Sequence, residues 1–137
     1  MDPPRTQLRL SKEIAALRHI EAAINFLSSG SFDLAITLAG AAEGMLEGTP
    51  RTSLFEKLRD SEKVADLGSK EWIASLNTER DWLKHETPGL PREMIFVRGQ
   101  AAIMVARAVS RLPKGSPLTG EFATWFIDYL PELGTGD

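Results

Sequence analysis

The sequence contains no cysteine and only two histidines, which excludes several classes of protein. A chain without cysteine has no disulfide framework, no thiolate metal site and no thiol nucleophile. It suits a reducing compartment, and residues 2–5 begin no apolar signal segment, so we expect a cytoplasmic protein. No apolar run approaches the roughly 20 residues of a membrane-spanning helix, and we expect no membrane association.

Catalytic motifs with strong sequence signatures are also missing. There is no His-x3-His pair and no dense cluster of histidines and carboxylates, so a metal enzyme is not expected. No glycine-rich phosphate loop precedes a predicted helix, and no Gly-x-Ser-x-Gly motif supports a serine hydrolase. We therefore expect no cofactor. The net charge of -3 disfavours general coating of nucleic acid, and an RNA-directed activity would need a local basic patch.

The pattern that is present is helical. A chain of 137 residues that is 42% apolar and 26% charged has the size and composition of one globular domain. Glycine and proline divide it into segments in which apolar residues recur at helical spacing, and no segment alternates like a strand. We predict a single all-α domain over residues 1–137, an up-and-down bundle of four to five main helices. Its core covers about residues 8–112, and a short C-terminal helix spans residues 117–131.

The predicted main helices occupy residues 6–28, 31–47, 53–67, 69–87 and 91–112. The tight break at residues 28–30 predicts that the first two form an antiparallel hairpin. Periodicity places Leu10 on the buried face of the first helix and Ile95 on the buried face of the fifth.

The helix predicted at residues 69–87 carries an unusual set of polar residues. Arg80 falls beside its apolar face, where a charged group is costly unless it is paired or hydrated. Asn77, Asp81 and His85 form an adjoining stripe at spacings of four residues, with Lys84 beside it. His85 lies in the last turn, where the helix dipole favours a cationic imidazole. The alternative interpretation of this stripe is an ordinary solvated helix face.

The second predicted helix has a matching feature, because Glu43 lies on its apolar face and needs a cationic or hydrogen-bonding partner. Arg80 is the candidate, either within a functional site or as a purely structural buried bridge. Gly40 and Gly44 cost helix propensity and suggest the close approach of another helix.

Other side chains allow two interpretations each. Trp82 points away from the predicted core, and marks either a contact surface or a position that another helix covers. A local basic patch or a solvated helix face accounts equally well for four cations near the fifth helix: Arg98, Arg107, Arg111 and Lys114.

Residues 80–85, Arg-Asp-Trp-Leu-Lys-His, match the Arg-x4-6-His signature of the HEPN superfamily, in which the second position is typically polar. Upstream, the alanine-rich segment 31–43 looks like the second helix common in HEPN domains. The chain thus resembles a HEPN domain over roughly residues 8–112.

This resemblance implies a metal-independent endoribonuclease, often a toxin or defence effector, whose homodimer brings two Arg/His motifs into one cleft. His85 would then assist proton transfer at the 2′-hydroxyl or the leaving oxygen, Arg80 would hold the scissile phosphate, and Asp81 would orient one of them. Glu43, Asn77 and Lys84 would support this catalytic set. The alternative that the resemblance allows is a non-catalytic HEPN adaptor that binds a nucleotide or a protein partner. The expected protein partners are an antitoxin or a nucleotidyltransferase-type protein.

Overall fold

The computed structural model describes residues 6–48 and 70–113, apart from the side chains of residues 70–76. These residues form four α-helices and no strand: α1 (Lys12–Ser29), α2 (Phe32–Met45), α5 (Lys70–Lys84) and α6 (Arg98–Val109). The prediction of an all-α bundle is therefore confirmed. The helices predicted at residues 53–67 and 117–131 lie outside the described residues.

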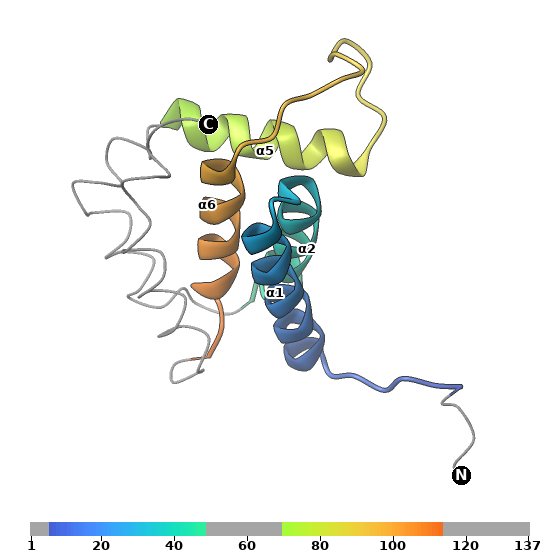
Figure 1. Ribbon diagram of the computed structural model, residues 1–137. Coiled ribbons are helices and arrows are strands. Elements are labelled where there is room, and N and C mark those ends of the chain that lie inside the picture. Colours follow the sequence, from blue (N-terminus) through green and yellow to red (C-terminus); the bar gives the residue numbers. More distant parts are fainter. Residues whose placement is uncertain (1–5, 49–69, 114–137) are drawn as a thin grey trace, which may run out of the picture.

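Three helices lie side by side, and the fourth crosses them. α1 and α2 form a hairpin, α6 packs against both, and α5 runs crosswise and contacts α2 (Figure 1). Buried side chains from α1, α2 and α6 form one apolar core, which includes Ile20, Ile36, Met104, Val105 and Val109. Each such side chain contributes roughly 1.5–3 kcal/mol by leaving water. No helix within the described ranges is long and apolar enough to cross a membrane.

Alanine is frequent where α2 and α6 are buried. The buried alanines of α2 are Ala35, Ala39 and Ala42, and those of α6 are Ala101, Ala102, Ala106 and Ala108. Such short side chains let two helix axes approach toward the lower end of the usual range of about 8–10 Å. The alanine-rich segment thus forms the central helix of the bundle, which α1, α5 and α6 all contact.

The hairpin between α1 and α2 follows directly from local sequence. Gly30 has a left-handed φ of 86°, which a residue without a Cβ adopts at little cost. Its N–H donates to the carbonyl of Leu27, and the next N–H, of Ser31, donates to Phe26, the pattern of a Schellman motif. The predicted break at residues 28–30 and the predicted start of α2 are confirmed.

The start of α1 differs from the prediction. The helix begins at Lys12, because the hydroxyl of Ser11 accepts a hydrogen bond from Ile14 N and caps the first turn. Residues 6–10 are not helical, and Leu10 is 39% exposed rather than buried. The helical spacing of apolar residues extends to the N-terminal side of Ser11, although the helix itself begins after this N-cap.

The start of α6 was also predicted wrongly. Helix α6 begins at Arg98 rather than near residue 91, and Ile95 is 83% exposed. α5 likewise ends at Lys84, earlier than predicted, so residues 85–97 form a long connection. This connection folds back over Trp82 instead of extending α6, which removes Ile95 from the buried face.

Candidate functional site

Arg80 lies against the backbone of α2. A Cβ added at Gly40 would meet Cδ of Arg80 at 3.0 Å and Cγ at 3.3 Å, closer than ordinary carbon contacts. Gly40 thus leaves the space in which the aliphatic part of Arg80 lies. At Gly40 the neighbour is a side chain of α5 rather than the backbone of another helix. At Gly44 the expected close approach is wrong, because an added Cβ would meet nothing within 4 Å.

The guanidinium of Arg80 is incompletely paired. Its side chain is 26% exposed, and its Nη2 lies 3.6 Å from Oδ1 of Asp81, too far for a hydrogen bond. The Nε atom is buried and has no hydrogen-bond partner among the described residues. An arginine with five donors and one long ionic contact retains the capacity to bind an anion.

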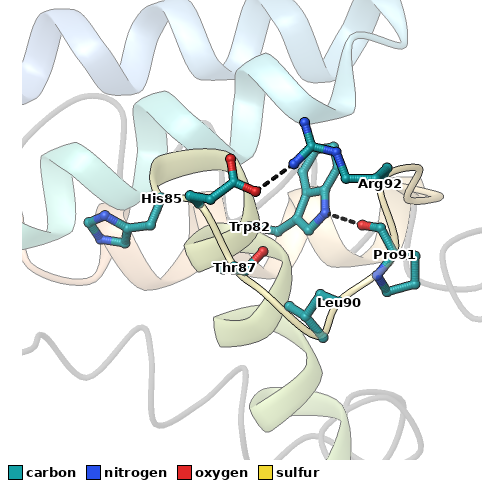
Figure 2. A pocket seen from close by; sticks show the side chains of 7 residues that line it. Trp82, His85, Thr87, Leu90, Pro91 and Arg92 are labelled. Carbon is teal, nitrogen blue, oxygen red and sulfur yellow. Dashed lines mark hydrogen bonds and ion pairs between the residues drawn. The ribbon is translucent and has the colours of Figure 1, made fainter.

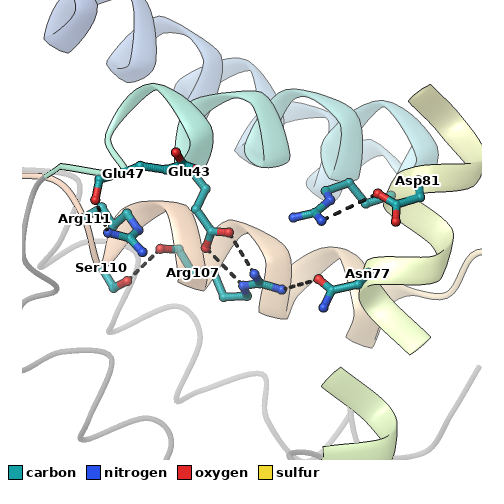
Figure 3. Close-up of polar contacts among 8 residues, drawn as sticks. Glu43, Glu47, Asn77, Asp81, Arg107, Ser110 and Arg111 are labelled. Atoms are coloured by element: carbon teal, nitrogen blue, oxygen red, sulfur yellow. Dashed lines mark hydrogen bonds and ion pairs between the residues drawn. The ribbon is translucent and has the colours of Figure 1, made fainter. Parts of the chain in front are cut away.

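Glu43 pairs with a different arginine from the one proposed by the sequence. Arg107 on α6 donates from Nε to Oε2 of Glu43 at 3.0 Å and from Nη2 to Oε1 at 2.8 Å. Its third nitrogen, Nη1, donates to Oδ1 of Asn77 on α5 at 3.1 Å (Figure 3). The expected pair of Glu43 with Arg80 is not formed. This buried network joins α2, α5 and α6, and it leaves Arg80 outside.

The same contacts change the interpretation of the basic residues near α6. Arg107 is engaged by Glu43 and Asn77, and Arg111 donates to the carbonyl of Glu47 at 3.1 Å (Figure 3). These two arginines therefore hold α6 against α2 and do not form a solvated patch. Arg98 is exposed, and Lys114 lies outside the described residues.

His85 lies just beyond the last residue of α5. Its N–H still donates to the carbonyl of Asp81, and its side chain is exposed, like those of Asp81 and Lys84. The five-residue separation from Arg80 turns the two side chains about 140° apart around the helix. Arg80 therefore faces α2 while His85 extends from the helix end. Of the predicted stripe, Asp81 and His85 face solvent, while Asn77 belongs to the buried network.

Trp82 is partly covered by the connection between α5 and α6 and, in the part of the chain that the structure describes, by no other helix. Its indole N–H donates to the carbonyl of Pro91 at 2.8 Å. Its ring contacts that of Phe96 edge-to-face, with the two ring centroids 5.9 Å apart. A turn at residues 87–90 makes this return possible. Leu90 N donates to Thr87 O, and Gly89 has a φ of 95°, as the third position of a Pro-Gly type II turn requires.

The returning connection and the end of α5 border an open pocket of about 180 Å³ beside His85. Its lining comprises Trp82, His85, Glu86, Thr87, Leu90, Pro91 and Arg92. Figure 2 shows the indole and the guanidinium of Arg92 on one side, with the imidazole of His85 at the opposite edge and directed away from them. Glu86 and Arg92 form an ion pair at the pocket. Sequence reasoning missed both residues, although the Thr-Pro-Gly-Leu turn signature was there to indicate that the chain reverses.

No group of three or more His, Asp or Glu side chains within residues 6–48 and 77–113 has an arrangement that could hold a metal ion. Comparison with protein-family models, with curated proteins and with solved structures found no match for this chain. The site is therefore interpreted from its own chemistry.

Proposed function

We propose that this chain is a homodimeric HEPN-like endoribonuclease that cleaves RNA without a metal ion and acts as a toxin or defence effector. Arg80, Asp81 and His85 carry the chemistry, and two copies of the motif meet in one cleft. The support is the Arg/His motif itself together with the environment of its two ends.

Arg80 supplies the main support. A buried ion pair with Glu43 would explain this arginine as a structural residue, but Arg107 occupies that role. Arg80 is left with a guanidinium that is partly exposed and, among the described residues, has a single long contact, with Asp81. A phosphate oxygen is a suitable partner for such a group, because arginine binds phosphate through two parallel N–H donors.

The reaction follows from the functional groups. The 2′-oxygen attacks the adjacent phosphorus and the bond to the 5′-oxygen breaks, which leaves a 2′,3′-cyclic phosphate and a 5′-hydroxyl. His85 of one copy accepts the proton of the 2′-hydroxyl, and His85 of the other copy donates a proton to the leaving oxygen. Arg80 offsets the negative charge that develops on the phosphate oxygens. Asp81, half-exposed and beside Nη2, limits the orientations of the guanidinium.

The test is cleavage of RNA by purified protein in excess EDTA, with Arg80→Ala and His85→Ala compared with the parent. Two control variants on α1, Arg18→Ala and His19→Gln, remove the same types of side chain from another part of the fold. We expect the parent and both controls to produce cyclic phosphate ends, and each site variant to lose at least about a hundredfold in rate. An inert parent, or site variants that cut as fast as the controls, would contradict the proposal. A substrate with 2′-deoxyribose at the cleaved position should not be cleaved, because it lacks the attacking 2′-hydroxyl.

A further inference from the structure

The pocket beside His85 is not explained by phosphate chemistry. Arg80 does not line it, and its walls combine an aromatic ring, an arginine, a glutamate and a threonine. We infer that this pocket binds one base of the RNA strand next to the cleaved phosphate, with a preference for guanine. The inference rests on the proposed ribonuclease function, because that function makes single-stranded RNA the ligand.

The size of the pocket suits a single ring system. Sites for drug-sized ligands usually span about 300–1,000 Å³, whereas this one holds about 180 Å³. A whole nucleotide would leave its sugar and phosphate outside. The imidazole of His85 lies at the edge of the pocket and points outward (Figure 2). A base inserted behind this edge would therefore hold its own phosphate close to His85.

Trp82 provides a surface on which a base can stack. Its ring is fixed in orientation by the hydrogen bond to Pro91 and by the edge-to-face contact with Phe96. Proteins that bind single-stranded RNA commonly stack unpaired bases on such rings. A ring that is already fixed loses little conformational entropy when the base binds.

Glu86 and Arg92 can read the edge of that base. Their ion pair uses Nη1 of Arg92 and Oε1 of Glu86, and the side chains remain 84% and 72% exposed. No contact within the described part of the chain occupies Oε2 of Glu86 or Nη2 of Arg92. Guanine presents two neighbouring N–H donors to a carboxylate, and O6 and N7 acceptors to an arginine. Adenine presents one amino group beside an acceptor nitrogen, so it satisfies this pair less well.

The experiment measures binding without cleavage. Fluorescently labelled eight-residue uridine strands carry guanine, adenine, cytosine, uracil or an abasic site at the fourth position, with 2′-O-methyl ribose throughout to block attack. Anisotropy gives the dissociation constant of each strand for the parent, Arg92→Ala, Glu86→Gln and the matched control Arg18→Ala. The abasic strand separates recognition of the base from attraction to phosphate.

We expect the parent to bind the guanine strand about tenfold tighter than the abasic strand, within the range found for a stacked base. Arg92→Ala should lower that ratio to the value that the adenine strand gives, because stacking on Trp82 remains. Glu86→Gln should remove the preference for guanine over adenine, and Arg18→Ala should leave both ratios unchanged. Equal affinity for the guanine and abasic strands would overturn the inference, as would an unchanged ratio in Arg92→Ala. A preference for another base would overturn the assignment to guanine.

Failure of this inference is distinguishable from failure of the proposed function. If the parent cleaves RNA through Arg80 and His85 but shows no base dependence, only the base pocket is wrong. If the guanine ratio holds while no RNA is cleaved, the pocket binds a base in a protein that is not a nuclease.

Discussion

The contact between Gly40 and Arg80 can be tested by comparing two glycine-to-alanine variants in one helix. Gly40→Ala and Gly44→Ala both replace a glycine of α2 with the best helix former, a change worth up to about 1 kcal/mol in a helix interior. The added Cβ meets nothing within 4 Å at Gly44, but at Gly40 it lies 3.0 Å from Cδ of Arg80. Only Gly40→Ala must therefore displace the arginine.

The two effects at Gly40 nearly cancel in stability. Carbon atoms attract best at about 3.5–4.0 Å, so Arg80 must withdraw by about 0.5–1 Å. An off-rotamer side chain costs about 0.5–1.5 kcal/mol, which offsets the gain in helix propensity. We expect Gly44→Ala to raise the free energy of unfolding by about 0.5 kcal/mol, and Gly40→Ala to leave it near that of the parent. When Arg80→Ala is also present, the alanine at position 40 has no arginine side chain to displace. Gly40→Ala should then become at least as stabilising as Gly44→Ala.

Cleavage should separate the two variants further. A shift of about 1 Å in a positioning group can reduce a rate by about a hundredfold, so Gly40→Ala should lose tenfold to a hundredfold while Gly44→Ala keeps the parent rate. Urea denaturation and the EDTA cleavage assay provide the two readouts. Equal stabilisation by both variants, also unchanged by Arg80→Ala, would show that Arg80 does not occupy the space over Gly40. Equal cleavage rates would show that its position there does not matter for catalysis.

Three further changes test other parts of the structure. Glu43→Gln and Arg107→Met should each lower the free energy of unfolding by about 3 kcal/mol, since each removes one charge of a buried ion pair and at least one of its two hydrogen bonds; the double variant should lose less than the sum, and additive losses in urea would contradict the pair. Ser11→Ala should cost about 1 kcal/mol by removing the cap on Ile14 N, and an unchanged thermal midpoint would rule that cap out. Gly89→Ala should cost about 1–2 kcal/mol because its φ is positive, and should speed hydrogen exchange at Leu90, whereas unaltered exchange would exclude the turn.

The parts of the fold that could be predicted are those determined by local sequence. The turn at Gly30 needs only a glycine that adopts a left-handed conformation after an apolar helix, and both features are visible in the chain. The alanine-rich helix α2 could also be predicted, because its alanines are themselves strong helix formers. The start of α6 could not be predicted, because Ile95 continues the helical spacing of the segment that follows it. In the fold, Phe96 contacts Trp82 of α5, and the helix begins only at Arg98.

The candidate site also combines features that local sequence determines with features that depend on tertiary contacts. The sequence indicated that Glu43 needs a cationic or hydrogen-bonding partner, and its burial in the structure agrees with that need. It could not identify the cation, because Arg107 lies 64 positions away and reaches Glu43 only when α6 packs on α2. Arg80 lies closer to Glu43 in the sequence than Arg107 does, and it was therefore the partner proposed from the sequence. The pocket beside His85 depends on the chain reversal at Thr87–Leu90, which was interpreted only as a helix end.

The position of Arg80 makes the second copy a requirement of the proposed chemistry. Its Cγ and Cδ lie against Gly40, so the guanidinium cannot turn toward His85 without leaving that contact. His85 is five residues further along, about 7.5 Å in rise and about 140° in rotation, and lies beyond the end of the helix. Within one copy the two side chains therefore address different regions of space. A two-fold axis near the end of α5 would bring Arg80 of one copy toward His85 of the other, and the phosphate would bind between them. Under this arrangement a folded monomer retains both residues and has no complete site, so the rate per chain depends on the fraction of chains that are paired.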